Sequence, residues 1–85
     1  MEFNYNLTFE ELSSELKELI YGVIEKICEN VEKYNINIQA LSEEVGMNYE
    51  QLMDYMVHPK NDYSGYLDIL DAINRMLGRW STWVI

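Results

Sequence analysis

The chain has 85 residues, 48% of them hydrophobic, which is the length and apolar content of one small globular domain. Fifteen acidic residues against six basic ones give a formal net charge of −9, which disfavours nucleic acid and anionic membranes as partners and favours basic ones. The single cysteine excludes an intramolecular disulfide, and with neither a signal peptide nor an apolar run of roughly 20 residues we expect a cytoplasmic protein that does not enter the membrane.

The first predicted element is a long helix over residues 8–33, which follows a short leader, residues 1–7. Thr8 and Glu11 have the spacing of a capping box, a common start of a helix. Downstream of them, aliphatic residues recur every three or four positions as far as Val31, which indicates one apolar helix face. Acidic residues fill most of the opposite face.

The length of this helix bears on the oligomeric state. Some 26 residues would extend over roughly 39 Å, whereas a domain of this size has a radius of gyration near 12 Å. Part of the helix is therefore expected to project or to pair with a second copy, unless it bends at Gly22. Cys28 falls among the apolar positions, and we expect its thiol to be buried.

Two short helices are predicted next, separated by a turn. Asn37 is suited to cap a helix over residues 38–45, and Gly46 is suited to the left-handed conformation that ends it. Asn48 then caps a helix that runs from Tyr49 to about residue 57.

The last predicted helix spans residues 64–77, after a loop that contains Pro59. Ser64 is the expected cap and Gly78 the expected end. An apolar tail follows, residues 79–85, with two tryptophans.

An exposed tail of this kind is a liability for a monomer, so we expect it to pack along the long first helix, in the same chain or in a second copy. We hypothesise a homodimer, and the candidate contacts are Leu12, Leu16, Trp80 and Trp83.

The segment 37–52, NIQALSEEVGMNYEQL, resembles the helix-turn-helix of the λ-repressor/Cro-like family. The matching positions are a capping residue, aliphatic residues inside both helices, a small residue where the helices cross, the turn glycine and the apolar residue after it: Asn37, Leu41, Ser42, Val45, Gly46, Met47 and Leu52. The resemblance covers about residues 20–78, and the N-terminal extension departs from the family. It implies an all-α, compact helix-turn-helix bundle of four to five helices with a long N-terminal helix.

The core is predicted from the same helices without the family. Inward positions of residues 37–57 and of the last helix are expected to meet: Leu41, Val45, Met47, Leu52, Tyr55, Ile69, Leu70 and Ile73.

The resemblance also implies a site. In the family the second helix of the motif enters the major groove of DNA, and its first residues contact base edges. The matching positions are Asn48 at the cap, Tyr49, Glu50 and Asp54 as base readers, and Gln51 and Met53 beside them. Ile38 stands where the family often has a glutamine that contacts phosphate.

The charge of this region conflicts with DNA binding. Residues 36–59 contain four acidic side chains and neither lysine nor arginine, although basic side chains supply most of the affinity for DNA. Two functions stay open: a sequence-specific DNA-binding transcriptional regulator of the Cro type, and a regulator that binds a protein partner through this scaffold. The charge favours the second, with a partner whose surface is basic or binds nucleic acid, as in small acidic inhibitors from phages and mobile elements.

We expect no catalytic residue, no metal site and no cofactor. His58 is the only histidine and has no cysteine or histidine near it in the sequence. Glycine-rich phosphate loops and hydrolase or metalloprotease motifs are absent from the sequence, so the chain is predicted not to be an enzyme.

Overall fold

A computed structural model describes the backbone of residues 7–84 and the side chains of residues 7–78. This part of the chain is all-helical, which confirms the predicted fold class. Its elements are a single 3-10 turn, η1 (Phe9–Glu11), and the helices α1 (Ser14–Lys33), α2 (Ile38–Val45), α3 (Tyr49–Val57) and α4 (Tyr63–Val84).

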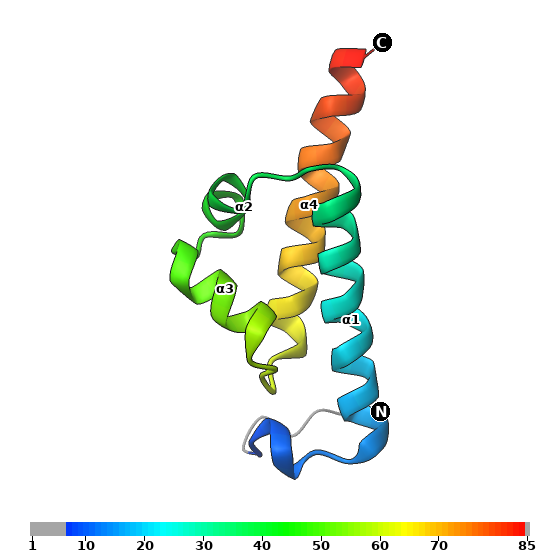
Figure 1. Ribbon diagram of the computed structural model, residues 1–85, viewed down its shortest axis with the longest axis vertical. Helices are drawn as coiled ribbons and strands as arrows, with labels where there is room; N and C mark the ends of the chain where they lie inside the picture. The colour runs from blue at the N-terminus through cyan, green and yellow to red at the C-terminus, as the bar shows by residue number, and fades with distance from the viewer. Residues whose placement is uncertain (1–6, 85) are drawn as a thin grey trace.

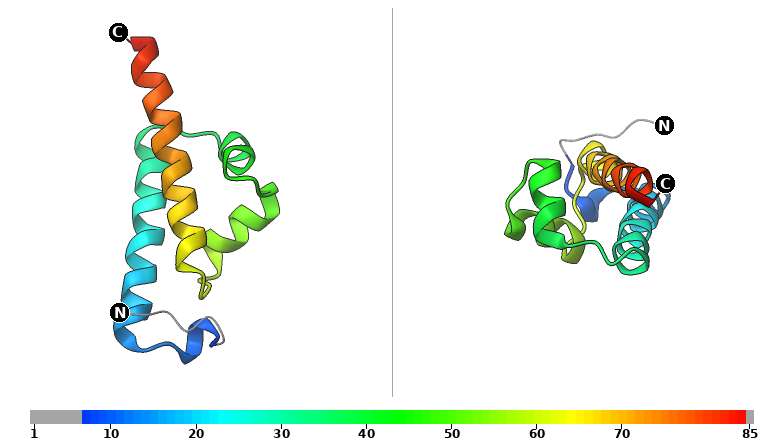
Figure 2. Two further views of the ribbon diagram at one scale, coloured as in Figure 1. Left: turned by 180° about the vertical axis from the view of Figure 1, so that it is seen from behind. Right: turned by 90° about the horizontal axis from the view of Figure 1, so that it is seen from above.

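The two long helices lie side by side and run in the same direction, α1 against α4 (Figure 1). The short helices α2 and α3 lie on the other side of α4, so that α4 separates them from α1 when the molecule is seen from the front or from behind (Figures 1 and 2). The last turns of α4 extend past the end of α1 (Figure 1). This arrangement leaves one side of α3 without a neighbouring helix.

The first helix begins later than predicted, because two capping signals follow each other in the sequence. The capping box at Thr8 is present, and the Thr8 backbone N–H donates to Glu11 Oε1 over 2.9 Å, but it closes only the turn η1. Leu12 is then extended, and Ser13 caps α1 by accepting the backbone N–H of Leu16. The helix predicted over residues 8–33 is therefore a 3-10 turn followed by an α-helix of 20 residues.

This break decides where the candidate dimer contacts lie. Leu12 is only 5% exposed and packs in the chain's own core, and Leu16 is half-buried against the same core. Leu12 therefore cannot serve as a surface contact in this conformation. The side chains of Trp80 and Trp83, the other two candidates, lie outside the described residues.

The last helix is longer than predicted at both ends. It begins at Tyr63 rather than at residue 64, and it continues through Gly78 to Val84, so the tail predicted over residues 79–85 is helical up to Val84. A glycine inside a helix costs only about 1 kcal/mol relative to alanine, so Gly78 alone does not end a helix.

Both predicted caps of the middle helices are confirmed. Asn37 Oδ1 accepts the backbone N–H of Ala40 at the start of α2. Gly46 ends α2 with a φ of 92°, a left-handed conformation that side chains with a β-carbon resist. Asn48 begins α3.

The core lies where α1, α2 and α3 meet α4. Of the predicted core residues, Leu41, Leu52, Ile69 and Ile73 are buried. The other four predicted core residues are partly buried against them: Val45, Met47, Tyr55 and Leu70. Further buried side chains come from η1, α1, α4 and the connector between α1 and α2, and they include Phe9, Ile20, Ile27, Ile36, Tyr66, Ala72 and Met76.

One expectation about α1 is wrong. Cys28 is exposed rather than buried, although partial burial still raises the pKa of its thiol. Gly22, the place where a bend was considered, is exposed, and a β-carbon built there would meet nothing within 4 Å.

Candidate functional site

The outer side of α3 carries two shallow grooves that meet at its first turn. The first, of about 300 Å³, runs along the helix and is lined by Tyr49, Glu50, Met53, Asp54, Val57 and His58. The second lies between the starts of α2 and α3 and is lined by Gln39, Asn48, Tyr49 and Glu50. Four of the six predicted site residues thus line the first groove, and Asn48 lines the second.

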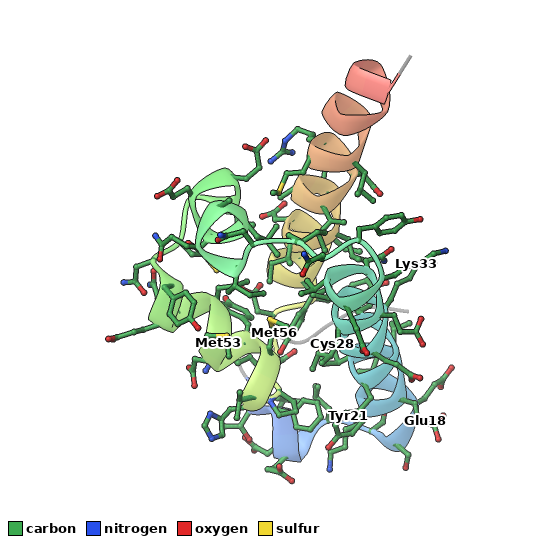
Figure 3. All side chains as sticks on the ribbon, turned by 45° about the horizontal axis from the view of Figure 1, so that its top comes forward. Glu18, Tyr21, Cys28, Lys33, Met53 and Met56 are labelled. Carbon is green, nitrogen blue, oxygen red and sulfur yellow. The ribbon has the colours of Figure 1, made fainter. Side chains whose placement is uncertain are left out.

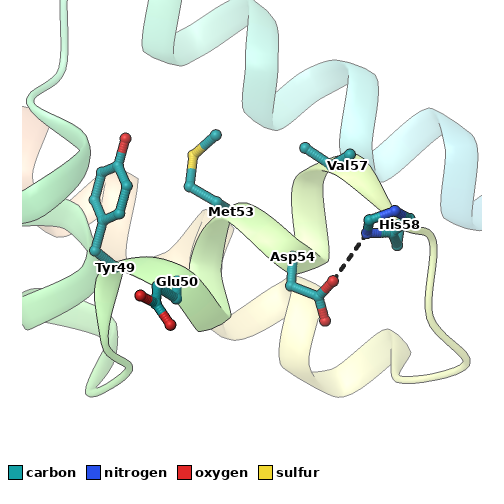
Figure 4. A pocket seen from close by; sticks show the side chains of 6 residues that line it. All are labelled: Tyr49, Glu50, Met53, Asp54, Val57 and His58. Carbon is teal, nitrogen blue, oxygen red and sulfur yellow. Dashed lines mark hydrogen bonds and ion pairs between the residues drawn. The ribbon is translucent and has the colours of Figure 1, made fainter.

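Two parallel rows of side chains form this surface, which we call the α3 face (Tyr49, Glu50, Met53, Asp54 and Val57). The apolar row is Tyr49, Met53 and Val57, spaced by four residues, which places them on one stripe of the helix. The acidic row is Glu50 and Asp54, and Figure 4 shows its side chains extending to the other side of the helix from the apolar row.

The two ends of the apolar row are exposed, and Met53 between them is half-buried. Tyr49 is 45% exposed and Val57 is 60% exposed, whereas Leu52 on the inner side of the same helix is wholly buried. The helix therefore buries one apolar stripe in the core and presents a second one to solvent.

Asn48 and Gln51, both predicted site residues, are engaged in capping α3. Asn48 Oδ1 accepts the backbone N–H of Gln51 over 2.8 Å, and Gln51 Oε1 accepts the backbone N–H of Asn48 over 3.1 Å. This reciprocal capping box fixes the start of the helix and so fixes the direction of Tyr49 and Glu50. Gln51 lines neither groove.

Two side chains that follow α3 in the sequence, Lys60 and His58, contact the Asp54 carboxylate. Lys60 Nζ lies 2.5 Å from Asp54 Oδ2, and His58 Nδ1 lies 2.9 Å from Asp54 Oδ1. These contacts, with Lys60 the larger effect, hold the pKa of the Asp54 carboxyl below its usual range. Asp54 is therefore ionised at neutral pH, but its charge is largely balanced locally.

The loop that presents Lys60 is itself fixed by a buried tyrosine. The Lys60 backbone N–H donates to the hydroxyl of Tyr66, which is wholly buried, and that hydroxyl donates to the Tyr55 carbonyl over 2.8 Å. Tyr55 in turn donates its hydroxyl to Asp62 Oδ2 over 2.5 Å, and this bond raises the pKa of Tyr55 to about 12.

Asp62, rather than Ser64, caps the last helix. Its Oδ1 accepts the backbone N–H of Gly65 over 3.2 Å, and the Ser64 hydroxyl donates to the same oxygen. Because one oxygen caps α4 and the other binds Tyr55, Asp62 ties the end of α3 to the start of α4.

The remaining described cations lie away from the α3 face. Lys17, Lys26 and Lys33 belong to α1, and Figure 3 shows Lys33 on the opposite side of the molecule from Met53. Arg75 of α4 binds the Glu44 carboxylate over 3.2 Å and Asp71 over 2.6 Å. Among the described side chains, Lys60 is thus the one cation at the α3 face.

Sequence reasoning missed three residues of the grooves, Gln39, Val57 and His58. Val57 continues the four-residue spacing of Tyr49 and Met53, so the apolar row was detectable in the sequence. The contact between Lys60 and Asp54 has no such signal, because it depends on the path of the loop.

The described residues hold no group of three or more His, Cys, Asp or Glu side chains arranged to bind a metal ion. Within the same part of the chain, no helix has the length and hydrophobicity needed to cross a membrane. Comparison with protein-family models, with curated proteins and with solved structures finds no match to this chain.

Proposed function

We propose that this chain is a small, non-enzymatic regulatory protein that acts by binding a partner protein through the α3 face. The partner's surface is basic or binds nucleic acid, as for small inhibitor proteins of phages and mobile elements. The observation that carries the proposal is the composition of that face, which joins an exposed apolar row to an acidic row.

The apolar row supplies the affinity in this proposal. Tyrosine and methionine are enriched in the centres of protein interfaces, where they bury a large area. From Tyr49 to Val57 the row spans nine residues, or roughly 12 Å of helix. An exposed helix stripe of this kind fits a groove on a partner, with the apolar side chains as anchors.

The acidic row supplies the selectivity. Carboxylates beside an apolar stripe favour a partner with cations at the rim of its groove and repel an acidic one. The bulk charge of the chain, −9, acts in the same direction at longer range.

The alternative is a sequence-specific DNA-binding regulator of the Cro type, and the succession of α2, a three-residue turn and α3 favours it. Its difficulty is that the described side chains provide no unpaired cation at α3 to hold phosphates, since most non-specific affinity for DNA comes from such contacts. Lys60 is engaged with Asp54, and Ile38 is packed against the core rather than directed at a phosphate.

A pull-down from a lysate of the organism that encodes the chain, with and without nuclease, separates the two functions. We expect capture of a protein that survives nuclease and is lost with the double variant Tyr49→Ala/Met53→Ala. Leu67→Ala is the matched control, because Leu67 is 43% exposed on α4, outside both grooves. Loss of all capture on nuclease treatment, or equal loss with Leu67→Ala, would contradict the proposal.

The homodimer expected from the first helix and the tail is not part of this proposal. Leu12 is buried inside the chain, so an interface that uses it would require the core to open.

A further inference from the structure

The two carboxylates of the acidic row differ in whether a side chain of the same chain already binds them. Both oxygens of Asp54 are occupied, one by Lys60 Nζ and the other by His58 Nδ1. Glu50 lies one helical turn earlier and is exposed, and within residues 7–78 no hydrogen bond or ion pair reaches its carboxylate. A cation that approaches the α3 face therefore finds Glu50 free and Asp54 already taken.

Glu50 is also better placed than Asp54 to contact a partner's cation. It lines both grooves, together with Tyr49, whereas Asp54 lines only the first. A basic side chain seated in either groove has the Glu50 carboxylate at its edge, next to an aromatic ring that also attracts cations.

Lys60 is held in place beside Asp54. Its backbone N–H is fixed by the hydroxyl of the buried Tyr66, over 3.0 Å, and its Nζ lies over the Tyr55 ring at 5.8 Å from the centroid. Its side chain is 36% exposed, less than an unconstrained surface lysine. The contact is therefore built into the loop between α3 and α4, and its geometry does not depend on a partner.

We propose that the α3 face binds a basic segment of a partner protein with the partner's cation on Glu50, and that Lys60 acts as an intramolecular competitor for Asp54. The inference rests on the proposed function, because it concerns the same face. It adds which carboxylate binds the partner, and that a side chain of this chain limits the binding. Removal of Lys60 then strengthens binding, while removal of Glu50 weakens it.

The test uses a defined probe, a short amphipathic peptide of leucine and lysine, titrated into the 15N-labelled full chain and followed by amide chemical shifts. We expect shifts centred on Tyr49, Glu50 and Met53. Glu50→Gln should weaken binding about two- to fivefold, the range of exposed ion pairs, and Asp54→Asn should weaken it less. Glu29→Gln, an exposed carboxylate of α1, is the matched charge control and should change little.

The competitor is tested by a double-mutant cycle. Lys60→Gln should tighten peptide binding about two- to fivefold, and adding Asp54→Asn should abolish this gain, because the gain comes from the freed carboxylate. Lys26→Gln, on the exposed side of α1, makes the same change in net charge and should tighten binding less. Unchanged amide shifts in the core confirm that each variant is folded.

The outcomes separate the two proposals. If the peptide leaves the α3 amides of the unmodified chain unperturbed, or shifts only α1, the proposed function fails. If the peptide binds at α3 but Lys60→Gln tightens binding no more than Lys26→Gln, or Asp54→Asn weakens it as much as Glu50→Gln, the further inference alone is overturned.

Discussion

Replacement of Gly65 by alanine tests whether the junction between α3 and α4 is held as described. Gly65 lies in the first turn of α4, and its backbone N–H is capped by Asp62 Oδ1. A β-carbon at this position would overlap Asp62 Oδ2, and it would lie 2.9 Å from Asp62 Cγ and 3.2 Å from the Tyr55 hydroxyl. The alanine side chain can fit only if the Asp62 carboxylate moves out of its place.

The expected size of the effect follows from the bonds that Asp62 makes. Loss of a helix cap costs about 1 kcal/mol, and loss of a hydrogen bond to a charged group costs about 1.5 to 3 kcal/mol, with the lower value apt for this half-buried pair. Alanine gives back about 1 kcal/mol through its higher helix propensity. The free energy of unfolding should therefore fall by about 1.5 to 2 kcal/mol.

Urea unfolding followed by circular dichroism measures this change, and Gly22→Ala is the matched control. A β-carbon at Gly22 meets nothing within 4 Å, so that variant should be more stable than the unmodified chain by about 0.5 to 1 kcal/mol. If Gly65→Ala were as stable as Gly22→Ala, Asp62 would not be fixed between Tyr55 and α4, and the account of the loop that presents Lys60 would fail.

Three further predictions concern stability, packing and exposure. The pKa of Tyr55 in the folded chain is raised to about 12, so the stability that this tyrosine contributes is complete below pH 10 and is lost as the pH rises toward 12. In urea unfolding across this range, Tyr55→Phe should not show that loss of stability. A variant with the same pH profile as the unmodified chain would contradict this prediction. Ser42 is wholly buried and donates its hydroxyl to the Gln39 carbonyl, so the larger side chain of Ser42→Leu should lower the free energy of unfolding by about 1 to 3 kcal/mol. Thermal unfolding measures this change, with Ser42→Ala as the control. A melting temperature equal to that of the control would refute the close packing around Ser42. Cys28 is exposed, so Ellman's reagent should label the folded chain, whereas labelling only in denaturant would show that the thiol is buried.

Local signals in the sequence were sufficient to predict where the two middle helices, α2 and α3, begin and where α2 ends. Asn37, Gly46 and Asn48 were predicted as caps because each acts on backbone groups within three or four residues, and the structure has all three in those roles. The start of α1 was not predicted, because Thr8 and Ser13 both carry capping signals and the choice between them depends on burying Phe9 and Leu12.

The candidate site was predictable in part for the same reason. Tyr49 and Met53 follow from the position of α3, since residues on one exposed stripe of a helix share a surface. The state of Asp54 was not predictable, because Lys60 reaches it only through the path of the loop, which depends on the long-range packing of Tyr66.

The most direct test of the central claim is the binding of random-sequence duplex DNA, measured by fluorescence anisotropy at ~50 mM salt, where phosphate contacts are strongest. The α3 face is acidic, and its nearest cation is already in an ion pair. We therefore expect no saturable change in the anisotropy of the DNA at the protein concentrations at which the leucine–lysine peptide binds. Saturable binding that weakens steeply with added salt, and that Glu50→Gln strengthens or Asn48→Ala removes, would show instead that α3 reads DNA.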